Sequence, residues 1–143
     1  MTAPMQPLHA TAVARLTPTG WRGLLIQGPS GVGKSDLALR LIGQGWRLVA
    51  DDWTYLWASN GALYASAPAT IAGRIEARGL GIVAAPLRPL ARIVLAVACT
   101  HDAVERLPET DDWIWDGVAI PRLRLDPRPA SAGQVVATAL AAL

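Results

Sequence analysis

Cysteine and lysine are almost absent from this chain of 143 residues, which contains one of each. The single cysteine, Cys99, excludes a disulfide framework, and its place at the end of the apolar run 93–98 predicts a buried strand residue. Lys34 is the only lysine beside 12 arginines. This bias indicates that position 34 requires an ammonium group that arginine does not replace.

Long hydrophobic runs and a strong charge of one sign are also missing. No basic-then-apolar signal pattern opens the chain, and no apolar run approaches about 18 residues, so we expect a cytoplasmic protein without a membrane partner. A net charge of +2 with scattered arginines argues against nucleic acid as the main partner. The composition, 52% hydrophobic and 17% charged, predicts a globular chain, and residues 1–143 have the size of a single domain.

The pattern of apolar residues and breakers predicts alternating strands and helices. Residues 11–16 and 23–27 are expected to be strands joined by a turn, followed by a glycine-rich loop and a helix at 36–42. Asn60-Gly61 is a hairpin signal, and Ser131 with Gln134 has the spacing of a capping box. Further elements are expected at residues 46–50, 54–57, 62–65, 75–83, 92–99, 122–125 and 131–143. The order of elements predicts an α/β domain with a mixed sheet.

The glycine-rich loop matches the pattern G-x-x-x-x-G-K-[ST] of a P-loop. Glycine lets backbone N–H groups turn toward phosphate oxygens, and the start of the following helix adds a positive partial charge. We expect Lys34 to contact the β and γ phosphates of a nucleoside triphosphate and Ser35 to bind Mg²⁺. The residues expected to bind the nucleotide are Gly28, Pro29, Ser30, Gly31, Val32, Gly33, Lys34 and Ser35.

Two carboxylates, Asp51 and Asp52, end the apolar strand that follows the P-loop helix. Carboxylates in this position hold Mg²⁺ or position the nucleophile in phosphoryl transfer. Because adjacent residues of an extended chain point to opposite sides, one can act as general base while the other orients metal or water. The alternative is a solvated strand end.

Glu76 and Arg78 are separated by one residue in a glycine-interrupted segment. If the segment is extended, both side chains lie on one face, where they offer an anion for a metal and a cation for phosphate. An exposed ion pair is an equally good interpretation from the residues alone. From the sequence alone, His9 and Arg106 are interpreted as exposed surface residues.

Three segments together resemble, in this order, the HPr kinase/phosphorylase family. They are the P-loop at 28–35, the Leu-Val-Ala-Asp-Asp run at 48–52, and Ile-Glu-Ala-Arg-Gly-Leu-Gly-Ile at 75–82. The third segment is the most specific. The resemblance covers most of the chain and is closest to the short form that consists of the C-terminal catalytic domain only. It implies an ATP- and Mg²⁺-dependent serine kinase that phosphorylates HPr or an HPr-like phosphocarrier protein and can remove the phosphate by phosphorolysis.

The resemblance also implies a role for individual residues. Lys34 would bind phosphate, and Asp51 would accept the serine proton and return it in the reverse reaction. The metal ligands would be Ser35 and Glu76, with Asp52 as a further candidate. His9 and Arg106 match the family's other catalytic residues.

Two alternatives remain open at this point. One is a small-molecule kinase, in which the arginines at 122, 124 and 128 form a lid over the phosphates. The other is a non-catalytic ATP-binding regulatory module. A homo-oligomer is possible in either case.

Overall fold

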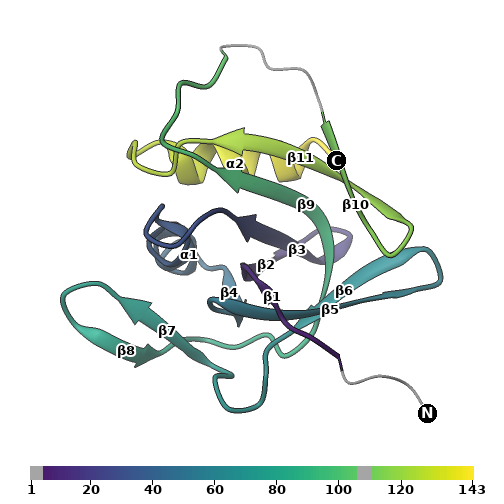
Figure 1. The fold of residues 1–143 in the computed structure, drawn as a ribbon, viewed down its shortest axis with the longest axis horizontal. Coiled ribbons are helices and arrows are strands. Elements are labelled where there is room, and N and C mark those ends of the chain that lie inside the picture. Colours follow the sequence, from purple (N-terminus) through teal and green to yellow (C-terminus); the bar gives the residue numbers. More distant parts are fainter. Residues whose placement is uncertain (1–4, 106–110) are drawn as a thin grey trace.

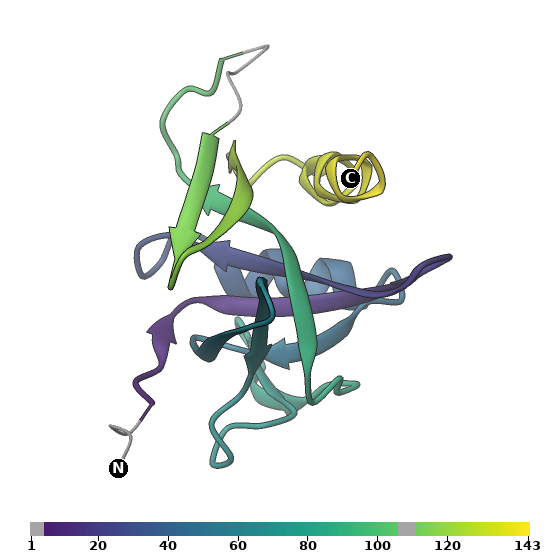
Figure 2. The same cartoon turned by 90° about the vertical axis from the view of Figure 1, so that its right-hand side faces the viewer.

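A strongly curled mixed sheet organises the protein, and its central strand is β9 (Ala91–Cys99). The computed structural model describes residues 5–105 and 111–143. One edge of β9 pairs in parallel with β3 (Gly20–Gln27). The other edge pairs with β6 (Ala62–Ser66) in its first half and with β11 (Val118–Leu125) in its second half. The sheet therefore divides along β9 into two wings, which Figure 2 shows curling apart.

The other strands extend these wings. β2 and β4 continue the sheet beyond β3 with antiparallel pairing, β5 and β1 continue it beyond β6, and β10 pairs with β11. In the described residues this makes nine strands in one sheet, while β7 and β8 form a separate two-stranded hairpin beside it (Figure 1). Their bounds are β1 Leu8–His9, β2 Thr11–Thr17, β4 Arg47–Ala50, β5 Trp53–Ser59, β7 Arg74–Ala77, β8 Gly81–Ala84 and β10 Asp111–Trp115.

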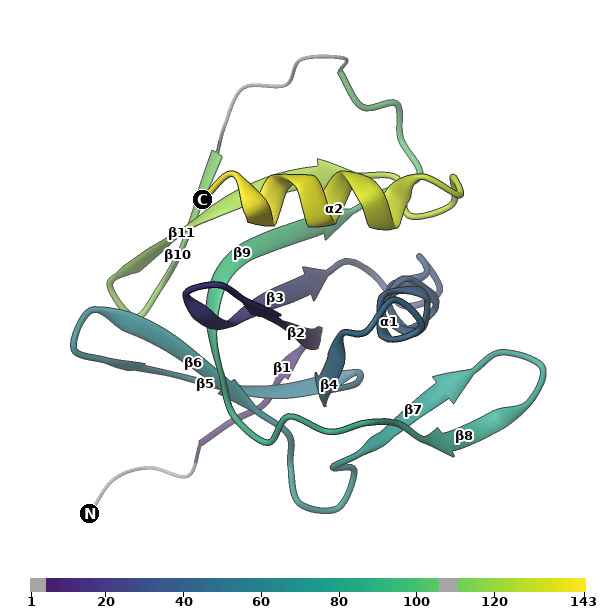
Figure 3. The ribbon, with the colours of Figure 1, turned by 180° about the vertical axis from the view of Figure 1, so that it is seen from behind.

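Both helices, α1 (Lys34–Ile42) and α2 (Ala132–Ala141), pack on the same face of the sheet (Figure 3). Alternation along β3 explains the two faces, because Leu24 and Ile26 pack toward the helices whereas Leu25 packs into the opposite core. That second core is closed by the curled strands β5, β6 and β11. Neither helix in the described ranges is long and apolar enough to cross a membrane.

The parallel strands β3, β9 and β11 end at one edge of the sheet. The glycine-rich loop follows β3 there, His101 follows β9, and Arg128 follows β11. In sheets of this type, ligands bind outside the carboxyl ends of parallel strands. The topology therefore brings three segments that are distant in the sequence to the same place.

The α/β class with a mixed sheet is confirmed, and two details differ from the sequence-based predictions. Ser131 precedes α2 in a helical conformation without a side-chain cap, so the predicted capping box does not form. The β10–β11 hairpin was not predicted, although its turn, Asp116-Gly117, has positive φ angles of 48° and 79°. The predicted hairpin at Asn60-Gly61 has the same conformation, with φ angles of 50° and 76°.

We expect Leu24→Ala to lower the free energy of unfolding by about 2–5 kcal/mol, because it opens a cavity at the centre of the sheet. Leu24 is fully buried, whereas Leu16 on the adjacent strand β2 is 61% exposed. Leu16→Ala is therefore the matched control and should change stability by less than about 0.5 kcal/mol. Urea denaturation of the two variants measures both values, and equal losses would contradict the core assignment.

Candidate active site

The glycine-rich loop between β3 and α1 has a backbone that side chains would obstruct. Gly28 has φ 148°, and a Cβ atom there would lie 2.9 Å from Val32 Cγ1 and 3.0 Å from the carbonyl oxygen of Cys99. Gly33 precedes α1 with φ 114°, and no side chain caps the helix. The backbone N–H groups of the first turn are therefore left for an anion, as in phosphate-binding loops.

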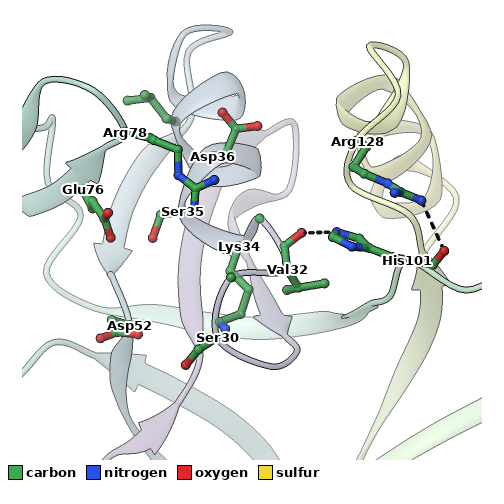
Figure 4. Close-up of a pocket in the computed structure, with 13 residues that line it drawn as sticks. Ser30, Val32, Lys34, Ser35, Asp36, Asp52, Glu76, Arg78, His101 and Arg128 are labelled. Atoms are coloured by element: carbon green, nitrogen blue, oxygen red, sulfur yellow. Dashed lines mark hydrogen bonds between the residues drawn. The ribbon is translucent and has the colours of Figure 1, made fainter.

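A cavity of about 520 Å³ lies over this loop. Residues of the loop and α1 form its floor, and side chains from four other segments form its walls (Figure 4). Glu76 and Arg78 stand on one side of the loop, and His101 and Arg128 stand on the other. The lining residues are Ser30, Gly31, Val32, Gly33, Lys34, Ser35, Asp36, Leu39, Asp52, Glu76, Arg78, His101 and Arg128.

Lys34 is buried within the loop and points its ammonium group at backbone oxygens. Its Nζ donates hydrogen bonds to the carbonyl oxygens of Gly28 at 2.7 Å and Pro29 at 3.0 Å. Burial lowers the pKa of Lys34, while the nearby Asp52, Cys99 and Asp51 act in the opposite direction. The carboxylates thus help to keep a cation in a position that water reaches poorly.

Asp51 is buried at the end of β4 and accepts three hydrogen bonds. One carboxylate oxygen, Oδ1, accepts from Thr11 Oγ1 at 3.0 Å and from Ser35 Oγ at 2.7 Å. The other, Oδ2, accepts from the backbone N–H of Glu76 at 3.1 Å. The carboxylate therefore connects β2, α1 and β7, and it orients the Ser35 hydroxyl beside the cavity.

The side chain of Asp52 points away from that of Asp51, because the backbone of Asp52 has a φ of 67°, in the left-handed region. Its side chain is 57% exposed and its Oδ1 lies 2.7 Å from His9 Nε2. The backbone N–H of Asp52 donates to Thr11 Oγ1 at 3.1 Å, which fixes the turn. The adjacent carboxylates thus differ in environment: Asp51 is held inside, and Asp52 faces the cavity.

Glu76 and Arg78 both border the cavity from the β7–β8 hairpin, and both are exposed. Asp51 positions this hairpin through its hydrogen bond to the Glu76 N–H. Arg106 lies outside the described residues. All the other predicted catalytic and metal-binding residues (His9, Lys34, Ser35, Asp51, Asp52 and Glu76) belong to this one connected arrangement.

Sequence reasoning missed His101 and assigned Arg128 only to an arginine lid. The ring Nε2 of His101 lies 2.9 Å from the Val32 carbonyl oxygen, so the imidazole supports the loop. Arg128 donates to the His101 carbonyl oxygen at 3.2 Å and pairs with Asp126 at 2.9 Å, which lowers the pKa of Asp126 to about 2.

Arg122 instead pairs with Asp111 on β10, so the three arginines do not form one lid. No local sequence signal marked His101 or Arg128, because each reaches the site only through the parallel pairing of the strand before it, β9 with β3 and β11 with β9.

Comparison with known proteins decides the family. The sequence model of the HPr Serine kinase C-terminal domain matches residues 9–87, which is more than half of the chain. The chain belongs to this family. The match contains the P-loop, both aspartates and the β7–β8 hairpin, whereas His101 and Arg128 lie beyond it.

Individual relatives of the HPr kinase family agree with this result. HPr kinase/phosphorylase of Streptococcus thermophilus (strain ATCC BAA-491 / LMD-9) is 34% identical over 133 residues, which cover 84% of this chain and 42% of the relative. The protein of the same name from Clostridium tetani is 50% identical over 64 residues, 45% of this chain and 21% of the relative. The chain thus spans about two fifths of the length of the first of these curated relatives.

A solved structure shows the same fold. It is entitled "Structure of the Hpr(Ser) kinase/phosphatase from Coxiella burnetii" and superimposes with a TM-score of 0.80. The match covers 96% of this chain and 95% of that chain at 24% sequence identity. The HPr kinase fold is therefore present here.

Cys99 is buried behind the P-loop, as its sequence position predicted, and burial raises its pKa to about 11. We expect the thiol to resist alkylation by iodoacetamide at pH 8 in the folded protein, because it is both protonated and shielded. Unfolding in urea should restore rapid labelling at this single cysteine, and intact mass spectrometry measures both rates. Fast labelling of the folded protein would contradict the packing of the loop against β9.

Proposed function

We propose that this chain is a protein-serine kinase that transfers the γ-phosphoryl group of ATP to HPr or an HPr-like phosphocarrier protein. The observation that carries this proposal is the pair formed by Asp52 and His9 at the wall of the P-loop cavity. It offers an exposed carboxylate to an incoming hydroxyl, while Lys34 and the loop N–H groups lie on the cavity floor. Family membership, shown by the match at residues 9–87, supports a kinase rather than another P-loop function.

In the forward reaction, the serine hydroxyl of the acceptor protein attacks the γ-phosphorus as the bond to ADP breaks. Its proton passes to a carboxylate of this chain, and ADP leaves with the bridging oxygen. Lys34 and the N-terminus of α1 stabilise the negative charge on the phosphates. Phosphorolysis would run in the opposite sense: inorganic phosphate attacks phosphoserine, pyrophosphate forms, and the same carboxylate returns the proton to the serine.

The geometry favours Asp52 as the proton acceptor, in place of the Asp51 named on the basis of resemblance. Both oxygens of Asp51 already accept hydrogen bonds, and the side chain is buried. Asp52 lines the cavity with a side chain that is 57% exposed, and its Oδ1 lies 2.7 Å from His9 Nε2. Asp51 is then the residue that orients Ser35.

The donor set suits Mg²⁺, because Ser35, Asp52 and Glu76 line the cavity with hydroxyl and carboxylate oxygens. Within residues 5–105 and 111–143, no three His, Cys, Asp or Glu side chains form a metal cluster. Mg²⁺ in kinases is held by one or two carboxylates together with substrate phosphates, so a protein-only cage is not needed. The ion, when bound with ATP, neutralises phosphate charge.

We expect wild-type protein with ATP and Mg²⁺ to add one phosphate to the organism's own HPr, measured by intact mass spectrometry. Lys34→Met should abolish transfer, because the variant keeps the aliphatic stem but loses the ammonium group. ATP binding by the wild type without transfer to HPr would refute the substrate assignment. The chain would then be a small-molecule kinase or a nucleotide-binding regulatory module.

Asp52→Asn and Asp51→Asn separate the two carboxylate roles. We expect Asp52→Asn to lower kcat at least about a hundredfold with little change in the Kd for ATP, as expected on removing a general base. Asp51→Asn should instead raise the Mg²⁺ concentration needed for half-maximal rate, because Ser35 loses its charged partner. If Asp51→Asn lowers kcat and Asp52→Asn changes the Mg²⁺ requirement, Asp51 is the base. Melting curves followed by circular dichroism show whether either variant is unfolded.

A further inference from the structure

The β7–β8 hairpin stands outside the main sheet but is firmly attached to it. Its inner face carries Ile75, which is 1% exposed and belongs to the core beneath α1, and Val83 packs against the same core. The backbone N–H of Ala85 donates to the Gly73 carbonyl oxygen at 2.9 Å and closes the open end of the hairpin. The projection seen in Figures 1 and 3 is therefore a supported platform beside the cavity.

The outer face of this hairpin is shared by a cavity residue and an exposed aliphatic side chain. Glu76, which lines the cavity, pairs directly across the hairpin with Ile82. Directly opposed residues of an antiparallel pair project from the same face, so Ile82 is on the cavity side. Ile82 is 66% exposed, and Leu80 at the tip is 78% exposed. A hydrogen bond of 2.9 Å from the Leu80 N–H to the Ala77 carbonyl oxygen holds the tip in place.

Positive charge accompanies these apolar side chains. Arg74 lies two residues before Glu76 on the same face of β7, and Arg78 follows β7 at the cavity wall. Both arginines are exposed, and neither forms an ion pair with another of the described residues. Arg78 lies in the turn near Leu80, and Arg74 pairs with Ala84 at the open end of the hairpin, so the platform carries exposed basic side chains at both ends.

We infer that the tip of this hairpin, Leu80 and Ile82, is the docking site for the protein substrate. The inference rests on the proposed function. A serine side chain is short, so its hydroxyl reaches the cavity only if the surface of the acceptor protein covers the cavity rim. On the Glu76 side that rim is the β7–β8 hairpin. The matching partner surface carries an apolar side chain beside the acceptor serine and carboxylates that face Arg74 and Arg78.

The double variant Leu80→Ser/Ile82→Ser tests this docking site, with Ile114→Ser as the control. Ile114 on β10 is also 66% exposed, and it does not line the cavity. We expect the double variant to raise the KM for HPr by about tenfold or more, as for loss of buried contact residues at an interface centre. The kcat and the Kd for ATP with Mg²⁺ should stay near wild type, and Ile114→Ser should change none of these values.

Arg74→Glu tests the charge of the platform, because Arg74 is exposed and is not among the cavity residues. We expect a rise of a few fold in the KM for HPr at low ionic strength that shrinks in high salt. A KM that is unchanged at every salt concentration would remove the acidic surface from the description of the partner.

Direct binding of HPr, measured by calorimetry, separates failure of docking from failure of the proposed function. If the wild type transfers phosphate and the double variant matches it, the docking site is wrong and the kinase assignment stands. If the wild type binds HPr through Leu80 and Ile82 without transfer, docking stands and the kinase assignment fails. If the wild type neither binds nor phosphorylates HPr, both are wrong. A wild-type dimer that the double variant abolishes, with unchanged kinetics, would assign the hairpin to self-association and overturn the inference.

Discussion

The buried carboxylate of Asp51 is the interaction on which the rest of the site depends. A charge taken out of water is costly unless hydrogen bonds compensate it, and here Thr11, Ser35 and the Glu76 N–H supply them. These partners come from three elements, β2, α1 and β7. Satisfying one carboxylate therefore sets the position of the P-loop helix and of the β7–β8 hairpin relative to the sheet. It also sets the direction of Asp52, since the chain turns outward immediately after Asp51.

The one lysine of the chain, Lys34, has a structural role. Its ammonium group lies close to two loop carbonyl oxygens in a buried position beside β9. An ammonium is a compact group on a flexible stem, whereas a guanidinium is planar and much larger, so arginine does not fit inside the loop. The chain uses arginine elsewhere, at the cavity walls, where Arg78 and Arg128 have room for a wider cation.

The two sides of the cavity are built in different ways. On one side, the β7–β8 hairpin brings Glu76, and β4 brings Asp52, within the segment that matches the HPr kinase family. On the other, the segments after β9 and β11 contribute His101 and Arg128 from beyond that match. His101 supports the P-loop through the Val32 carbonyl oxygen, so the shape of the shared loop depends on a contact outside the matched region.

Much of this protein could be predicted from local sequence patterns. The P-loop, the hairpin at Asn60-Gly61 and the buried strand that ends at Cys99 each depend on neighbouring residues, because backbone conformation and period are local properties. The β10–β11 hairpin was also within reach, since Asp116-Gly117 carries a turn signal of the same kind.

The sequence by itself determined that a loop with the P-loop pattern and two adjacent carboxylates are present. Only the tertiary structure decided which carboxylate is buried and which faces the cavity, because that depends on Thr11, Ser35 and His9, residues 16 to 43 positions away. The same holds for His101 and Arg128, which reach the site only because β9 and β11 run parallel to β3. Strand pairing over long separations is set by the packing of the whole sheet, and no local pattern records it.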